Sequence, residues 1–245
     1  LELHKAHGII TGRIDDVSNN YNINDWIVVS GSSEEGPAIV MLTDGSKKLR
    51  NFQNESIADK TAYAKHHNYT FILCPTTLDK YRITTWSKLK LIYKVFSETK
   101  HKNILWLDVD TIIWNRKTPI TFSPSNKSIV AQLDLHRSYK SRYFNAGVLI
   151  IQKTDWIMTV LGQAYQQWQI AILRGICYFD ADQDALNLVM KRLGNVDEHL
   201  ELKRYSHLWT LSKDRQREPF LLHFPNCVRG RCAAEYIDLQ RQAMQ

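Results

Sequence analysis

The stretch Asn103-Ile104-Leu105-Trp106-Leu107-Asp108-Val109-Asp110 decides the fold. Its apolar run is too short for a helix and ends in acid, so we predict a buried strand over 104–108. Side chains alternate along an extended chain, which would turn Asp108 and Asp110 to one side and Val109 into the packing. Two convergent carboxylates at the end of a strand are typical of a Mg²⁺ or Mn²⁺ site with open positions for phosphate oxygens. An Asp-x-Asp sequence in a solvated loop is the alternative.

Strands and helices alternate on the amino-terminal side of this stretch. We predict strands over 38–42 and 69–73, a helix capped by Ser56 and running to residue 67, and an amphipathic helix over about 86–96. This order favours βαβ units and a mostly parallel sheet. Ligands of such sheets bind beyond the carboxyl ends of the strands, where Thr43, Asp44, Asp108 and Asp110 are expected.

The pattern is less regular in the second half of the chain and in residues 1–36. We predict strands over 128–133, 147–151 and 221–224, and helices that start at Thr154 or Asp155 and at Asp182, the latter ending at Gly194. Residues 1–36 are mostly polar, and we interpret them as an N-terminal extension or stem remnant with an edge strand over 26–29. Residues 37–245 are predicted to form one domain.

The composition is that of a soluble globular protein, with 44% hydrophobic and 23% charged residues. A net charge of +7 suits an acidic ligand such as a sugar nucleotide, although solubility alone would also explain it. Lys and Arg are scattered, so we expect no nucleic-acid partner. No apolar stretch is long enough to span a membrane. The first residue is Leu, which leaves room for a membrane anchor upstream.

Two further segments contain candidate functional groups. His223 lies in the apolar run 220–224 and is either a hydrogen-bonded core residue or a third metal ligand. Asp182, Gln183 and Asp184 open a helix, where acids stabilise the amino terminus. Alternatively, one of them faces a reacting sugar carbon.

Basic residues and a glycine segment add weaker candidates. Lys88, Arg229 and Arg231 could neutralise phosphate charge, or be ordinary surface residues. Asn145-Ala146-Gly147 indicates either a close approach of the backbone to a ligand or a turn before a strand. Cys74 is expected to be a buried thiol, whereas Cys227 and Cys232 are close enough in sequence to bridge.

Taken in order, these pieces resemble glycosyltransferase family 34, a group of retaining galactosyl-, xylosyl- and mannosyltransferases with a GT-A fold. The resemblance spans about residues 38 to 232. The matching segments are Ile39-Val40-Met41-Leu42-Thr43, Lys60-Thr61-Ala62-Tyr63-Ala64-Lys65-His66-His67, Trp86-Ser87-Lys88-Leu89, Leu105-Trp106-Leu107-Asp108-Val109-Asp110, Phe144-Asn145-Ala146-Gly147 with Trp156, Asp182-Gln183-Asp184-Ala185-Leu186, and Pro219-Phe220-Leu221-Leu222-His223-Phe224 with Cys227 and Cys232. The chain departs from the family pattern at Asp44-Gly45 and between the two last cysteines.

The resemblance implies an α/β fold of the GT-A type, with a Rossmann-like sheet in a catalytic domain over 37–245. It implies Asp108, Asp110 and His223 as ligands of Mn²⁺ or Mg²⁺, and Asp182, Gln183 and Asp184 as catalytic residues. The residues implied to bind the nucleotide-sugar donor are Thr43, Asp44, Trp86, Lys88, Asp108, Asn145, Arg229 and Arg231. The donor base, and which Arg contacts the diphosphate, stay open.

The expected activity is therefore metal-dependent retaining transfer of a sugar from a nucleotide sugar to an oligosaccharide or polysaccharide acceptor. A metal-dependent phosphoester hydrolase and a catalytically silent sugar-binding module are the alternatives. For a eukaryotic protein we expect the Golgi lumen, as a truncated type II membrane protein, and otherwise the cytoplasm.

Overall fold

A computed structural model of the chain describes residues 26–31, 35–44, 50–79, 81–120, 127–133, 144–174, 181–203, 206–208, 220–224, 238–239 and 241–242. The helices are α1 (Arg50–His67), α2 (Thr84–Glu98), α3 (Asp155–Arg174), α4 (Ala181–Leu193) and α5 (Val196–His199). The strands are β1 (Ile27–Ser30), β2 (Ala38–Leu42), β3 (Thr70–Cys74), β4 (Asn103–Leu107), β5 (Thr111–Ile113), β6 (Ile129–Leu133), β7 (Phe144–Gln152), β8 (Leu200–Lys203), β9 (Ser206–Leu208) and β10 (Leu221–His223). None of the described helices is long and apolar enough to cross a membrane.

The main sheet has seven strands in the order β1-β3-β2-β4-β7-β6-β8. Strands β2, β3 and β4 are parallel, β7 is antiparallel to β4 and to β6, and β8 is parallel to β6. Only β1 and β7 therefore run against the common direction. This architecture confirms the predicted α/β fold with a mostly parallel sheet, and β1 is the expected edge strand.

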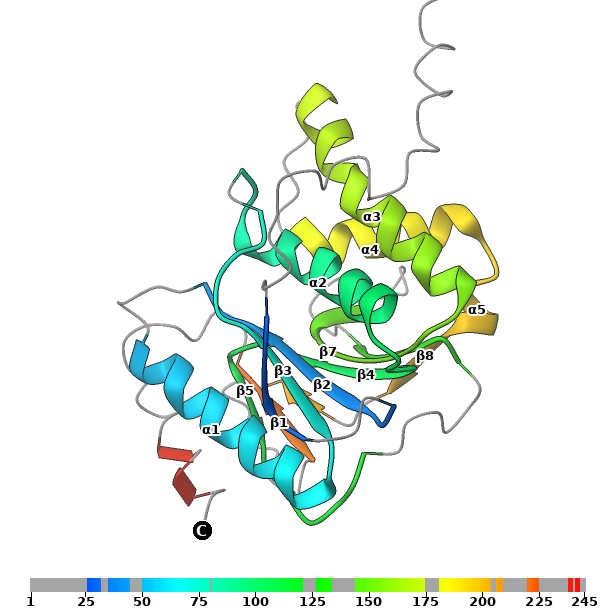
Figure 1. Ribbon diagram of the computed structural model, residues 1–245. Helices are drawn as coiled ribbons and strands as arrows, with labels where there is room; N and C mark the ends of the chain where they lie inside the picture. Colours follow the sequence, from blue (N-terminus) through cyan, green and yellow to red (C-terminus); the bar gives the residue numbers. More distant parts are fainter. Residues whose placement is uncertain are drawn as a thin grey trace, which may run out of the picture.

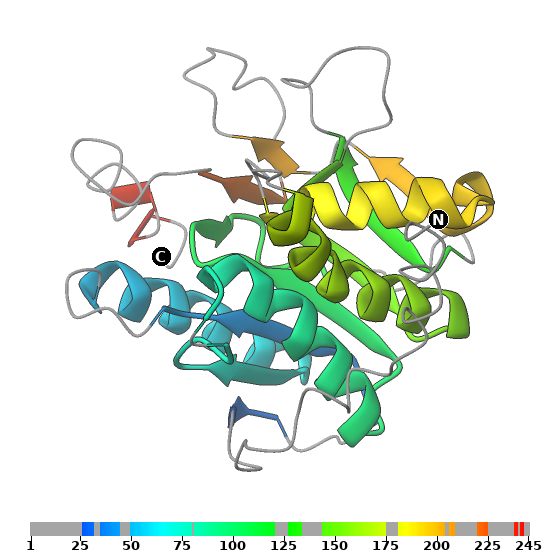
Figure 2. The same cartoon turned by 90° about the horizontal axis from the view of Figure 1, so that it is seen from above.

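Helices cover both faces of this sheet (Figures 1 and 2). Side chains of β2 alternate between the faces, as a strand buried on both sides requires. Ala38, Val40 and Leu42 belong to the core cluster under α2, α3 and α4, whereas Ile39 and Met41 pack with Tyr63 of α1. The acid-tipped strand β4 lies in the middle of this sandwich, so its carboxyl end is held rigidly.

A second sheet of three short strands, in the order β5-β10-β9, was not predicted. Strand β5 begins directly after the acids, and β10 pairs with it antiparallel. The strand predicted over 221–224 is confirmed as β10, whereas β5 and β9 are only three residues long and carry too little periodicity to be recognised from the sequence. This small sheet joins the carboxyl-terminal run 221–224 to the acids.

Some predicted boundaries were wrong. Helix α1 starts at Arg50 rather than at Ser56. The Ser56 side chain is buried inside the helix, where its hydroxyl accepts a hydrogen bond from Lys60 Nζ at 3.0 Å instead of capping a terminus. Strand β7 extends three residues further toward its amino end than expected and includes Phe144. Helix α4 ends before Gly194 as predicted, and that glycine has a φ of +76°.

Candidate active site

Asp108 and Asp110 lie on a tight turn between β4 and β5, called the acid turn below. The prediction had placed them on extended chain. The backbone N–H and the hydroxyl of Thr111 both donate to the Asp108 carbonyl, at 3.2 and 2.7 Å, and these bonds close the turn. Val109 packs against an apolar cluster that includes Phe52 and Ile112, as expected. A turn brings both carboxylates to one side by folding the chain rather than by alternation.

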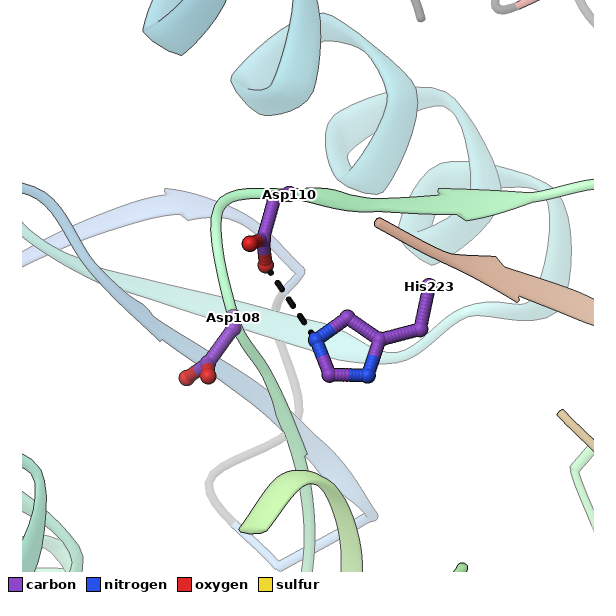
Figure 3. Close-up of side chains that lie close together, drawn as sticks. All are labelled: Asp108, Asp110 and His223. Carbon is purple, nitrogen blue, oxygen red and sulfur yellow. Dashed lines mark ion pairs between the residues drawn. The ribbon is translucent and has the colours of Figure 1, made fainter. Parts of the chain in front are cut away.

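Pairing of β10 with β5 places His223 beside these acids. His223 lies opposite Thr111 in the ladder, and the N–H of Phe224 donates to the Asp110 carbonyl at 2.9 Å. The imidazole Nε2 lies 3.4 Å from Asp110 Oδ1 (Figure 3). Ligand atoms of Asp108, Asp110 and His223 all lie within 4.8 Å of one another. The sequence-predicted metal group is therefore brought together across more than a hundred residues of chain.

Burial makes this group suited to a cation. His223 is only 2% exposed, and Asp110 Oδ1 and His223 Nδ1 are buried polar atoms without a hydrogen-bond partner among the described residues. Such atoms are costly unless something pairs with them. Two carboxylates and an imidazole form a donor set that Mn²⁺ accepts, and Mg²⁺ also binds carboxylates. The residues present thus fit a divalent metal ion.

Lys88 of α2 connects the acid turn to helix α4. Its Nζ lies 3.1 Å from Asp108 Oδ1 and 2.8 Å from Asp182 Oδ2, and it donates to the Ala146 carbonyl at 2.9 Å. The ammonium also lies 5.3 Å from the ring centre of Trp106, whose Nε1 donates to Asp108 at 2.7 Å. The predicted surface alternative for Lys88 is therefore wrong, because its side chain is only 5% exposed.

The charges in this cluster shift one another's protonation. Burial alone disfavours the Lys88 ammonium, but Asp108 and Asp182 outweigh it and raise the pKa of Lys88. Burial raises the pKa of Asp182, and nearby Asp108 adds to this, while Lys88 opposes both. One cation thus holds two carboxylates that would otherwise repel each other.

The three predicted catalytic residues in the first turn of helix α4 differ in their surroundings. Asp182 and Gln183 are buried, and Gln183 Oε1 accepts a hydrogen bond from the Ala146 N–H at 2.9 Å. Asp184 is half-buried. Asp182 is therefore linked to the acid turn by Lys88, and Gln183 is hydrogen-bonded to the backbone of Ala146. A residue that only caps the helix would need neither contact.

The remaining residues predicted to bind the donor make other contacts, and among them Asn145 lies next to the metal group through Gly147. Thr43 is buried at the end of β2, and exposed Asp44 accepts a hydrogen bond from Gln53. Trp86 is fully buried in the main core, and Asn145 Oδ1 accepts from the Gly147 N–H at 2.8 Å. Their roles toward a donor stay predictions. Arg229, Arg231, Cys227 and Cys232 lie outside the described residues, and Cys74 is a buried free thiol as predicted.

The sequence analysis did not predict the contacts that link the site residues to one another. The Lys88 bridge to Asp182 joins residues that lie far apart in the chain, and no spacing rule links them. The pairing of Trp106 Nε1 with Asp108 follows from i and i+2 side chains sharing one side of a strand end, so alternation could have indicated it.

Comparison with known proteins agrees with this geometry. Residues 27–126 match the profile of the galactosyl transferase GMA12/MNN10 family, which is glycosyltransferase family 34. The chain is a glycosyltransferase of the GT-A type. The family resemblance expected from the sequence is thereby confirmed over this part of the chain. No curated protein matches the sequence significantly.

Solved structures share the fold at low sequence identity. A glycosyltransferase involved in glycosylation of the major capsid of PBCV-1 is 13% identical, with a TM-score of 0.64 over 84% of this chain and 98% of its own. The galactosyltransferase LgtC, solved with donor and acceptor sugar analogs, is 15% identical, with a TM-score of 0.52 over 84% of this chain and 95% of its own. The glycosyltransferase GlyE of Streptococcus pneumoniae TIGR4 is 14% identical, with a TM-score of 0.53 over 84% of this chain and 60% of its own.

Proposed function

We propose that this glycosyltransferase is metal-dependent and retaining, and that it moves a hexosyl or pentosyl unit from a nucleotide sugar to a glycan hydroxyl. UDP-galactose, UDP-xylose and GDP-mannose are the donors to test first. The observation that carries the proposal is the group of Asp108, Asp110 and His223, in which the half-buried Asp108 shares Lys88 with Asp182. The crystal of LgtC with donor and acceptor sugar analogs supports a donor and an acceptor as the two substrates.

Asp108, Asp110 and His223 would hold the ion, with Mn²⁺ favoured over Mg²⁺ because one ligand is an imidazole. When bound, such an ion neutralises negative charge that develops on a diphosphate leaving group. The protein's part is to keep the three ligand atoms together in a buried place. The rigid β4 end and the β5–β10 pairing do this before any substrate arrives.

Lys88 is a cation that pairs directly with Asp108 of this group. Its raised pKa keeps it charged at neutral pH, so it would add to the stabilisation of a diphosphate lying in front of Asp108. Because Lys88 also pairs with Asp182, donor binding would weaken that pair and leave the negative charge of Asp182 less compensated.

Asp182 and Gln183 would then stabilise positive charge at the anomeric carbon as the bond to phosphate breaks. In the absence of donor, Asp182 is paired with Lys88 and so is not available as a strong base, and the neutral amide of Gln183, held by the Ala146 N–H, is not a base. We therefore propose that the acceptor hydroxyl attacks from the face that the phosphate leaves and gives its proton to a departing phosphate oxygen. That route retains the configuration of the sugar.

The test measures release of nucleoside diphosphate from a panel of nucleotide sugars, with and without Mn²⁺ and with and without acceptor glycans. We expect release that requires the metal and is stimulated by an acceptor, and proton NMR of the product should show a retained anomeric configuration. Release of equal rate without acceptor would favour a hydrolase. Release of nothing with any donor would favour a silent binding module.

The metal requirement is tested by Asp110→Asn. We expect turnover to fall on the order of 10²-fold, because Asp110 is a buried ligand of the group. Asp155→Asn, an exposed acid at the start of α3, is the matched control and should keep wild-type turnover. In addition, Mn²⁺ should raise the melting temperature of the wild type and EDTA should reverse this, since a ligand bound only to the native state stabilises it. Full turnover of Asp110→Asn would refute metal dependence.

A further inference from the structure

We infer that Gly147 is a positioning residue for the metal ligand His223, an inference that rests on the proposed function. A Cβ atom added at Gly147 would lie 2.5 Å from His223 Nε2 and closer still to Cε1. Non-bonded carbon and nitrogen atoms require well over 3 Å. The imidazole therefore occupies the place that any side chain at residue 147 would need.

The usual reason for a glycine does not apply at this position. The glycines with positive φ among the described residues are Gly31 and Gly194, so the backbone of Gly147 is one that other residues adopt. Its missing side chain, rather than its backbone freedom, is what the structure uses. The close approach expected from the Asn145-Ala146-Gly147 sequence is thus an approach to His223.

Strand β7 has an irregularity at this glycine. Ala131 of β6 pairs with Leu149, but the next residue, Gln132, pairs with Asn145, so three residues of β7 are fitted between two neighbouring pairs. Such a bulge bends the strand and re-aims its groups. Here it brings the backbone of Gly147 against the His223 ring, which is buried on a residue held in the β5–β10 ladder.

The same bulge holds the rest of the site. The Gly147 carbonyl accepts a hydrogen bond from the Asp108 N–H at 2.8 Å, and the Ala146 carbonyl accepts one from Lys88 Nζ at 2.9 Å. The Ala146 N–H donates to Gln183 Oε1 at 2.9 Å. One short segment therefore sets the distance between the acid turn, the imidazole and helix α4.

The experiment measures Mn²⁺ affinity in Gly147→Ala by electron paramagnetic resonance of the free ion. We expect binding at least tenfold weaker than in the wild type, because positioning groups around metal ligands typically change affinity 10- to 100-fold. Gly194→Ala is the matched control: a Cβ at that glycine meets nothing within 4 Å, so Mn²⁺ affinity should be unchanged. Thermal unfolding of each variant shows whether it is folded.

A second pair of variants tests whether the methyl group acts through the imidazole. In a His223→Ala background the ring is gone and, of the three closest contacts, only that with Asn145 Oδ1, at 3.0 Å, remains, so adding Gly147→Ala should lower the melting temperature much less than it does in the wild type. The double variant also stays informative if Gly147→Ala alone does not fold. A wild type that binds no Mn²⁺ would refute the proposed function. Normal Mn²⁺ affinity in Gly147→Ala, or an equal fall in melting temperature in both backgrounds, would overturn the role of Gly147 while leaving the metal site intact.

Discussion

Replacing Lys88 with methionine removes one positive charge from between two carboxylates while keeping an unbranched side chain that lacks only the terminal nitrogen position. In the native protein Nζ lies 2.8 Å from Asp182 Oδ2 and 3.1 Å from Asp108 Oδ1. Asp182 is nearly inaccessible, with 6% of its side chain exposed, whereas 32% of the Asp108 side chain is exposed. Solvent can therefore compensate Asp108 but not Asp182.

Removing one partner of a buried ion pair typically costs about 3–5 kcal/mol, because the other charge is left without compensation. We expect Lys88→Met to lose roughly that much stability at pH 7. In the double variant Lys88→Met/Asp182→Leu no unpaired buried charge remains at residue 182. Much of the loss should then be recovered.

The loss should depend on pH in a defined direction. The native pKa of Asp182 is raised by burial, and without Lys88 it should rise further, so the folded state binds a proton that the unfolded state has released. Stability of Lys88→Met should therefore fall as pH rises from the ordinary carboxyl range toward neutrality. In the wild type Lys88 has a raised pKa, so its contribution is complete below about 10.5 and is lost only as pH rises above that value.

Urea unfolding at pH 4.5 and at pH 7 measures both effects. Lys100→Met is the matched control, because Lys100 pairs with Glu35 at 3.7 Å and both side chains are mostly exposed. Such a pair contributes less than about 1 kcal/mol. Equal stabilities of Lys88→Met and Lys100→Met at pH 7, or a Lys88→Met variant that becomes more stable as pH rises over this range, would refute the argument from the ion pair.

Two further substitutions test how the site is supported. Asp59 is fully buried, accepts a hydrogen bond from the Ile113 N–H at 3.0 Å and pairs with Lys60 at 3.3 Å. Asp59→Asn should therefore lower the free energy of unfolding in urea by about 3–5 kcal/mol. It should also weaken Mn²⁺ binding, because Ile113 belongs to β5 and the loss of this contact would displace that strand. A loss below about 1 kcal/mol would contradict this role. Gly194→Ala places a side chain at a φ of +76° with no clash, so its melting curve should report a loss of about 1 kcal/mol, and an unchanged curve would contradict the backbone strain.

Short-range patterns were enough to predict most of the main sheet. The apolar run of β2, the acid-ended run of β4 and the helical spacing of α2 each contain their own signal, because burial selects side chains within a few residues. The order of these elements then restricts the topology to parallel crossovers. The metal group was proposed through the resemblance to a family, and the local sequence alone left His223 as either a core residue or a ligand.

What the sequence by itself determined is thus the α/β class, the acids at the carboxyl end of the central strand, and the candidates for their partners. Only the tertiary structure decided that β10 pairs with β5, that Lys88 joins Asp108 to Asp182, and that Gly147 makes room for His223. The physical reason is the distance along the chain over which each signal acts, because side-chain periodicity reports only the burial of a single helix or strand. The contacts that build the site depend on strand register, a bulge in β7 and the sharing of one buried charge, and these exist only once distant segments have packed together.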